Sequence, residues 1–367
     1  MKSRLLFVDD DANVLDGLRR VLRSQRDEWD MHFAGSGAEA LQIMDLHPID
    51  IIITDISMPV MNGVELLENV MDRYPETIRM ILSGRSESDL FMKAVAVTHQ
   101  YLSKPCNPAI LKSAIAQATE SKIFLQDENL KSLISNIGAL PSVPRLYREV
   151  SQELKSPEAS LNKIGEMISS EPAMAAKVLQ VANSAFFARR HGISKISEAV
   201  SYLGLDRVAQ LILAIHAFSE FKPAESGSFP IEQLWTHSNS TAARAKQIAE
   251  DQHASAKTAD DAFTAGLLHD IGKLILAGRF PEEYATTMTK AITDQIPLYL
   301  AERETFSVTH AEVGAYLLAI WGLPNPIVDA VAYHHNPTTI PVQSFSALTA
   351  VHAADTLEYM ADSEAVH

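Results

Sequence analysis

The first 120 residues alternate short apolar runs with segments of helical spacing. Five runs are typical of buried strands, at 4–8, 31–34, 49–54, 78–83 and 100–102. Helical spacing separates and follows them, at 12–24, 37–45, 63–73, 87–97 and 108–120. Parallel strands need a crossover connection, usually a helix. The pattern therefore predicts an α/β domain with a doubly wound, five-stranded parallel sheet and helices on both faces.

Nearly all of the chain after residue 140 has helical spacing instead. The predicted helices are 161–169, 172–183, 196–203, 206–218, 231–251, 260–277, 311–321, 325–334 and 345–359. We see no second block rich in strands, so this part is predicted to be all-α. The expected division is a first domain at 1–120, a helical connector at 121–138, an output domain at 139–345, and its C-terminal helix and tail at 346–367.

The connector leaves two interpretations open. From residue 108 to about 137 apolar residues recur every three or four positions, and no Gly or Pro interrupts them. One long helix would be a stiff connector and could pair with its copy in a homodimer through the first domain and the connector. The alternative is two separate helices.

Composition excludes several classes of protein. The formal net charge is −15, and nucleic-acid binders normally carry a basic surface, so direct binding of nucleic acid is not favoured. The single cysteine, Cys106, cannot form an intramolecular disulfide. No apolar run reaches the roughly 18–20 residues of a membrane span, and the N-terminus has acids too early for a signal peptide. A cytoplasmic protein is expected.

Polar side chains follow four of the five predicted strands. Asp9 and Asp10 follow the first, Asp55 ends the third, Ser83 ends the fourth and Lys104 follows the fifth. The carboxyl ends of parallel strands meet at one edge of the sheet, where ligands bind. Clustered carboxylates raise one another's pKa unless a cation offsets them, and Mg²⁺ prefers such oxygen ligands. A magnesium site with phosphate-binding groups beside it is predicted.

This arrangement resembles the receiver domain of bacterial two-component response regulators, which has a flavodoxin-like fold, over all of residues 1–120. The resemblance implies that Asp55 accepts a phosphoryl group from a sensor histidine kinase. It implies that Lys104 and Ser83 contact the phosphoryl oxygens and that Tyr101 is the aromatic switch residue. The implied ligands of Mg²⁺ are Asp9, Asp10, Asp55 and the backbone carbonyl of Ser57.

A second constellation lies in the helical part. Residues 266–273 read Gly266-Leu-Leu-His-Asp-Ile-Gly-Lys, with His269 and Asp270 adjacent on one predicted helix. Imidazole and carboxylate groups brought together from several helices of a bundle can hold a divalent transition metal. The further candidate ligands are His237, His310, His334, His335 and Asp355.

The doublet resembles the HD superfamily of metal-dependent phosphohydrolases. By that resemblance the metal ligands are His237, His269, Asp270 and Asp355. His310, His334 and His335 match additional ligands of the cyclic-di-nucleotide phosphodiesterase branch, and Lys273 matches its lysine, a base or anion ligand. That branch continues its double histidine with Glu and Gly-Tyr-Pro, whereas this chain continues with Asn336-Pro-Thr-Thr.

A wider resemblance is to the HD-related output domain, HDOD, over about 135–340. It rests on motifs at 140–144 (Leu-Pro-Ser-Val-Pro), 171–184 (ending Ala-Asn-Ser), 201–205 (Ser-Tyr-Leu-Gly-Leu) and 321–324 (Trp-Gly-Leu-Pro). The family implies a signalling module that binds a downstream protein or a cyclic-nucleotide second messenger. The alternative is a metal-dependent phosphohydrolase. A transcription factor is disfavoured because no basic recognition helix is evident.

Overall fold

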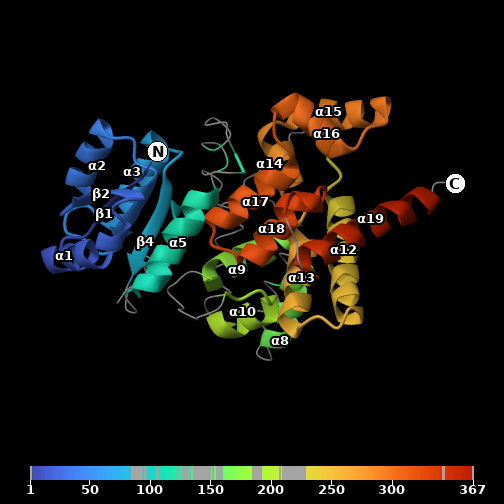
Figure 1. Ribbon diagram of the computed structural model, residues 1–367, viewed down its shortest axis with the longest axis horizontal. Coiled ribbons are helices and arrows are strands. Elements are labelled where there is room, and N and C mark those ends of the chain that lie inside the picture. The colour runs from blue at the N-terminus through green and yellow to red at the C-terminus, as the bar shows by residue number, and fades with distance from the viewer. Residues whose placement is uncertain are drawn as a thin grey trace. The chain divides into compact units, whose positions relative to one another are not determined.

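The chain forms two compact units, which are described separately (Figure 1). One consists mainly of Met1–Gly138, and the other mainly of Ala139–Ala182, His191–Ala319 and Leu323–His367. The computed structural model describes residues 2–83, 97–104, 107–121, 160–183, 192–205, 229–340 and 344–365, with 94, 124, 125, 131, 134, 150, 153 and 208. Within these residues, none of the helices has both the length and the apolar character that a membrane span requires.

The first unit is a five-stranded parallel sheet in the order β2-β1-β3-β4-β5. Its strands are β1 (Ser3–Val8), β2 (Trp29–Ala34), β3 (Ile51–Asp55), β4 (Ile78–Ser83) and β5 (Gln100–Ser103). The described helices are α1 (Ala12–Val21), α2 (Gly37–Leu46), α3 (Gly63–Arg73) and α5 (Pro108–Glu120) (Figure 1). The predicted fold class is confirmed. The predicted helix at 87–97 lies outside the described residues except for 94 and 97.

The loop after β3 is shaped by capping and by one close approach. All five residues of β3 are buried, as expected for a strand covered on both faces. Helix α3 then starts with a capping box, in which Asn62 accepts from the Glu65 amide and the Glu65 side chain accepts from the Asn62 amide. A Cβ on Gly63 would lie 2.1 Å from the Asp55 carbonyl oxygen. Glycine at this position lets α3 begin directly against the residue that ends β3.

Of the two interpretations of the connector, one long helix from 108 to about 137 is wrong. Helix α5 ends at Glu120, and its cap Ser121 directs its hydroxyl to the Ala118 carbonyl at 2.7 Å. Phe124 is in a turn and Leu125 has no regular structure, whereas Lys131 and Ile134 are helical. A serine that bonds to its own helix backbone competes with helix continuation, which explains the interruption.

The described part of the second unit contains only helices and short turns. They are α8 (Leu161–Ser169), α9 (Pro172–Asn183), α10 (Ile196–Leu203), α12 (Ile231–Asp251), α13 (Ala256–Leu268), α14 (Ile271–Arg279), α15 (Pro281–Asp294), α16 (Leu298–Phe306), α17 (His310–Ile320), α18 (Asn325–Tyr333) and α19 (Ala347–Ala365). Helix α12 packs on α13 and α19, and α18 packs on the same two helices. These four helices and α17 surround the histidine-rich site.

Two features of this unit were not predicted correctly. The segment 260–277 is two helices rather than one, because α13 ends at Leu268 and α14 starts at Ile271. Helices α15 and α16 were missed, since they are rich in Thr and charged residues and bury few side chains. The predicted helix at 206–218 lies outside the described residues except for 208.

Candidate functional site

Three acids and a lysine gather at the carboxyl edge of the sheet. Asp9 and Asp55 are almost fully buried, and Lys104 lies 2.7 Å from a carboxylate oxygen of Asp9 and 2.6 Å from one of Asp55. Asp10 is exposed, yet one oxygen from each of the three acids falls within 4.8 Å of the others. Carboxylates this close fit a hard divalent cation such as Mg²⁺.

The other residues predicted for this edge differ in how exposed their side chains are. Ser57 is exposed in the loop after β3, and Tyr101 on β5 is 1% exposed. The Ser83 side chain lies outside the described residues, although its backbone ends β4. Burial lowers the pKa of Lys104, but the hydrogen bonds and charges of Asp55 and Asp9 outweigh this and raise the pKa. Lys104 is therefore a fixed positive charge between the two acids.

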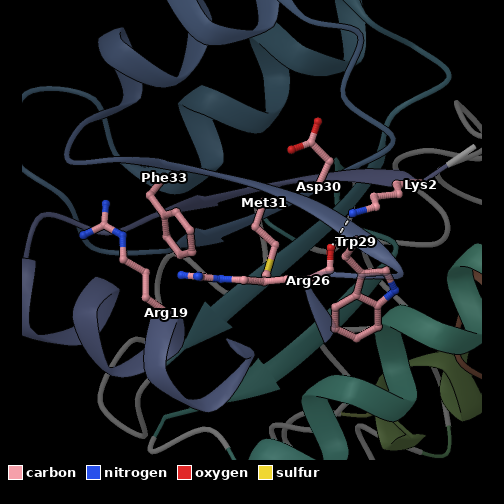
Figure 2. Close-up of a pocket in the computed structure, with 7 residues that line it drawn as sticks. All are labelled: Lys2, Arg19, Arg26, Trp29, Asp30, Met31 and Phe33. Carbon is pink, nitrogen blue, oxygen red and sulfur yellow. Dashed lines mark hydrogen bonds between the residues drawn. The ribbon is translucent and has the colours of Figure 1, made fainter. Parts of the chain in front are cut away.

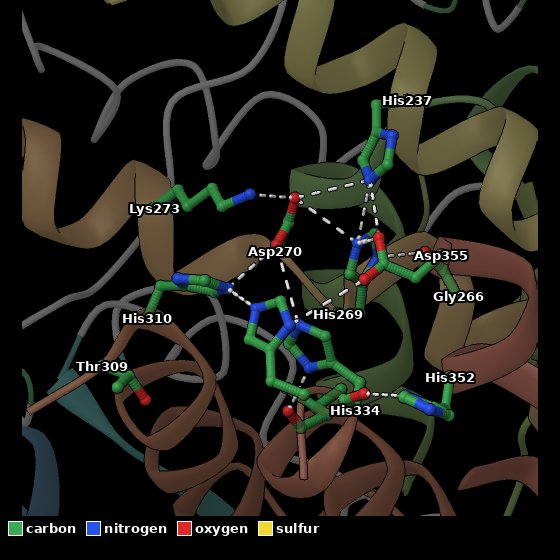
Figure 3. A network of polar contacts seen from close by, with 12 residues as sticks. His237, Gly266, His269, Asp270, Lys273, Thr309, His310, His334, His352 and Asp355 are labelled. Atoms are coloured by element: carbon green, nitrogen blue, oxygen red, sulfur yellow. Dashed lines mark hydrogen bonds and ion pairs between the residues drawn. The ribbon is translucent and has the colours of Figure 1, made fainter. Parts of the chain in front are cut away.

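The second unit brings every predicted histidine and acid of the helical part together (Figure 3). His237 comes from α12, His310 from the start of α17 and Asp355 from α19, while His334 and His335 follow α18. One set of ligand atoms belongs to His237, His269 and Asp355, and another to His310, His334 and His335. Within each set the atoms lie within 4.8 Å of one another.

Asp270 lies between the two sets. One of its oxygens is 3.1 Å from His310 Nε2, and the other is 3.4 Å from His269 Nε2 and 2.6 Å from Lys273 Nζ. The prediction that His269 and Asp270 share one helix is wrong, because His269 caps the end of α13 and Asp270 caps the start of α14. A change of chain direction between them lets neighbouring residues reach the same centre from different helices.

A close helix approach makes this arrangement possible. A Cβ on Gly272 would lie 1.9 Å from the carbonyl oxygen of His310 and 2.7 Å from its carbonyl carbon. Only glycine fits, so α14 can contact the first residue of α17 directly. This contact places His310 beside Asp270.

The histidine tautomers are set by oxygens behind the rings. Nδ1 of His269 donates to the Gly266 carbonyl at 2.7 Å, and Nδ1 of His334 donates to the Val331 carbonyl at 2.8 Å. Nδ1 of His310 donates to a carboxylate oxygen of Glu302 at 2.7 Å. A neutral imidazole that donates from Nδ1 has a lone pair on Nε2. In the neutral form of each ring, Nε2 therefore presents a lone pair to the centre, as in histidines that bind metals.

Two atoms of the centre are buried without a hydrogen-bond partner among the described residues. They are His334 Nε2 and Asp270 Oδ1, and an unpaired buried polar atom costs free energy. A divalent cation would satisfy both, so the residues present fit a metal. Five imidazoles and two carboxylates favour a transition metal over Mg²⁺.

The pKa values at this centre follow the same geometry. Burial raises the pKa of Asp270, but His269 and Lys273 outweigh it and hold the pKa well below its usual range. Burial lowers the pKa of His269, but Asp270 and Asp355 raise it to about 10. Burial and the neighbouring histidines lower the pKa of His334 to about 3 and also lower that of His335. The acids are ionised, and His334 and His335 are neutral.

A pocket of about 580 Å³ opens beside the histidines. Lys273 and His335 contribute polar groups, and the Tyr299 ring is stacked on His335 with 4.5 Å between centroids. The apolar lining comes from Ile296, Pro297, Leu298, Tyr299, Tyr359 and Met360. A site with polar groups at one end and apolar walls suits a phosphate ester of an organic group.

Sequence reasoning missed the residues that support the ligands. Glu302 contacts His310, and Tyr284 donates its hydroxyl to Glu302 at 2.7 Å. His352, which is not among the predicted ligands, donates from Nδ1 to the His334 carbonyl at 2.6 Å. Glu302 lies in a helix that was not predicted, and its only sequence signal is a position eight residues before His310.

A further pocket, of about 450 Å³, lies along the edge strand β2 of the first unit (Figure 2). Its lining combines Lys2, Arg19 and Arg26 with Trp29, Asp30, Met31 and Phe33. The Arg19 guanidinium lies 4.5 Å from the centre of the Phe33 ring, and Lys2 donates to the Arg26 carbonyl at 2.7 Å. None of the acids at the carboxyl edge lines this pocket.

Known protein families match both parts of the chain. The model of the response regulator receiver domain matches residues 5–116, and the model of the HDOD domain matches residues 140–337. An uncharacterized protein of Treponema pallidum is 28% identical over 205 residues, which are 56% of this chain and 39% of that protein. The hydrogenase transcriptional regulatory protein HoxA of Cupriavidus necator is 31% identical over 44% of this chain and 32% of its own length.

Solved structures are also similar. The MmoQ response regulator of Methylococcus capsulatus has 28% identity and a TM-score of 0.48, and the match covers 59% of this chain and 87% of that one. The matches to the two curated relatives span two fifths or less of their length. The chain belongs to the HDOD family and, with a receiver domain before its HDOD domain, is a response regulator.

Proposed function

We propose that this response regulator is phosphorylated on Asp55 with Mg²⁺ bound by Asp9, Asp10, Asp55 and the Ser57 carbonyl. The observation that supports this is the cluster of three carboxylates at the carboxyl edge of the sheet, two of which contact Lys104. A carboxylate oxygen of Asp55 attacks the phosphorus, and the bond from phosphorus to the donor histidine breaks. Lys104 and Ser83 then contact the phosphoryl oxygens, and the added charge of about −2 changes the face that includes Tyr101.

Incubation with a small-molecule phosphodonor and Mg²⁺ tests this proposal. Mass spectrometry of the intact chain is expected to show one added phosphoryl group, and Asp55→Asn is expected to abolish it. Asp72→Asn, which changes an exposed acid on α3, is the control and should label like the wild type. Equal labelling of Asp55→Asn would contradict the assignment.

For the output domain we propose a metal-dependent phosphohydrolase with two divalent transition-metal ions. His237, His269 and Asp355 would hold one ion, His310, His334 and His335 the other, and Asp270 would lie between them. The observation that carries this proposal is the set of three Nδ1 hydrogen bonds, which turn the Nε2 atoms of three rings toward a centre that also holds buried carboxylates. A simple binding module needs no such arrangement.

The residues around the ions have separate tasks in this proposal. Bound divalent metal would polarise a phosphoryl oxygen and activate water near neutral pH. Lys273, 2.6 Å from Asp270, keeps that carboxylate ionised and presents an ammonium group to an anion in the pocket. The Tyr299 ring and the apolar side chains at 296–298 would hold the organic part of the ester and exclude water from it.

Metal analysis and a turnover assay together test the output function. We expect about two equivalents of transition metal in the purified full chain and slow hydrolysis of bis(p-nitrophenyl) phosphate. His269→Ala should lose one equivalent of metal and the hydrolysis, whereas His253→Asn, at an exposed position with a positive φ that Asn tolerates, should retain both equivalents and the hydrolysis. Absence of metal would overturn the proposal. Metal without turnover of any phosphoester would instead support the binding module.

A further inference from the structure

Glu302 is a buried carboxylate that no function above assigns. It lies on α16, has no exposed surface, and receives three hydrogen bonds. Its Oε1 accepts from the Tyr284 hydroxyl at 2.7 Å. Its Oε2 accepts from the backbone amide of His310 at 2.8 Å and from Nδ1 of the same residue at 2.7 Å. Both oxygens are therefore satisfied, and two of the three donors belong to one residue.

These contacts are more than a helix cap. The start of α17 already has a capping pair, because Glu312 accepts from the Thr309 amide at 2.9 Å. Glu302 instead fixes His310 at two atoms, which sets both the position and the rotation of its ring. Because a carboxylate can only accept, Nδ1 must carry a proton, and in the neutral ring the lone pair then lies on Nε2.

The two ligand sets differ in charge. His237 and His269 share their set with Asp355, whereas His310, His334 and His335 are all imidazoles. Asp270 lies between the sets and is also paired with Lys273. The carboxylate nearest to an ion among the three imidazoles would be that of Asp270, whose Oδ1 is 3.1 Å from His310 Nε2 and 3.9 Å from His334 Nε2, and whose other oxygen faces His269 and Lys273. The nearest further negative charge along the hydrogen bonds of that set is Glu302.

We propose that Glu302 is a positioning residue for the second metal ion, orienting His310 and supplying, through that ring, negative charge in addition to that of the shared Asp270. This inference rests on the proposed two-metal function. Replacement of a carboxylate that supports a metal-binding histidine typically weakens metal binding by about 10–100-fold. Glu302→Gln should therefore weaken only the second ion and leave the ion at His237, His269 and Asp355 in place.

A cobalt titration of the full-length protein tests this. The protein is first freed of transition metal and kept in excess Mg²⁺, which occupies the acidic site of the receiver. Co²⁺ is then added, with visible absorbance and elemental analysis of dialysed samples as the two measurements. The wild type should bind two equivalents. Glu302→Gln should bind one equivalent at the wild-type affinity and the second about tenfold or more weakly.

Three further variants make the result specific. Glu304→Gln changes an exposed acid on the same helix that pairs with Lys290, and should titrate like the wild type. Asp355→Asn should produce the reverse pattern, with the first ion lost. Tyr284→Phe keeps the Glu302 charge and its contacts to His310, and should cost only a few-fold in the second affinity. If circular dichroism shows that Glu302→Gln does not fold, Tyr284→Phe still tests the inference. Retention of the second ion in Tyr284→Phe supports the inference. A loss of affinity as large as that expected for Glu302→Gln contradicts it.

The possible outcomes distinguish failure of the Glu302 role from failure of the proposed two-metal function. Two ions at wild-type affinity in folded Glu302→Gln would overturn the inference alone. Loss of both ions in that variant would show a general structural role and would also overturn it. A wild-type protein that binds no Co²⁺ would overturn the proposed two-metal function, and this inference with it.

Discussion

Both units gather aspartates beside one lysine, but they offset the negative charge differently. At the carboxyl edge of the sheet, Lys104 bridges Asp9 and Asp55, and 28% of its side chain is exposed. In the helical unit, Lys273 pairs with one aspartate, Asp270, and 9% of its side chain is exposed, while imidazoles surround that acid. Water reaches the first site and hardly reaches the second. The first suits a ligand that exchanges, and the second suits a metal ion that stays bound.

The same kind of substitution should therefore change the unfolding free energy by different amounts in the two units. The largest difference is expected for substitution of glycine by alanine. Gly272→Ala places a Cβ 1.9 Å from the His310 carbonyl oxygen, so α14 and α17 must separate. We expect a loss of about 3 kcal/mol or more in the unfolding free energy of the helical unit. Gly17→Ala has no atom within 4 Å and should stabilise α1 by about 0.5–1 kcal/mol.

Urea denaturation followed by circular dichroism measures both changes in the full-length protein. Equal stability of Gly272→Ala and the wild type would show that the close approach of α14 to His310 is not required. Elemental analysis of the same sample should show loss of transition metal, since His310 would move away from Asp270.

A smaller difference is expected from the two lysines. Lys273→Met leaves a buried carboxylate without its cation, which typically costs about 3–5 kcal/mol. Lys104→Met should cost about 1–2 kcal/mol, because water and Mg²⁺ can reach Asp9 and Asp55. The comparison is made by urea denaturation with and without Mg²⁺. Added Mg²⁺ should restore Lys104→Met and leave Lys273→Met unchanged. The reverse pattern would contradict the contrast between the sites.

The last prediction concerns the pH dependence of stability that Lys177, a buried lysine of the helical unit, should produce. Burial lowers the pKa of Lys177 to about 7, whereas the unfolded chain keeps the usual value near 10.5. The unfolded state therefore binds more protons between these two pH values, so stability rises with pH across that range. From pH 7 to pH 9 the gain is roughly 2 kcal/mol.

Lys177→Met should remove this dependence. Thermal unfolding at pH 7, 8 and 9 is the measurement, and the variant should change less with pH than the wild type. Lys163→Met changes an exposed lysine on α8 and is the control. An identical slope in Lys177→Met and the wild type would show that the lysine keeps its charge when buried.

The sheet could be predicted from the sequence because its strands are short, largely apolar runs that alternate with segments of helical spacing. The clustering of the acids that follow the strands could be predicted as well, since parallel strands bring their carboxyl ends to one edge. In the helical unit the ligands His237, His269 and Asp355 were predicted from residue type and resemblance. Their arrangement in two sets around Asp270 was not, because it depends on how five helices cross. Nor could the support from Glu302 be foreseen, since α16 has a weak apolar pattern.

The boundary between α13 and α14 has a consequence for how this site can change. His269 closes one helix and Asp270 opens the next, so the doublet depends on the register of two separate helices. Each residue of an α-helix turns the chain by about 100°. Deleting one residue within α13 would rotate the position of His269 away from the centre while Asp270 kept its place at the start of α14. Insertions and deletions in α13 should therefore remove the ion at His237, His269 and Asp355 first, and a chain that has lost that ion could still keep the fold of α14 and the His310 contact.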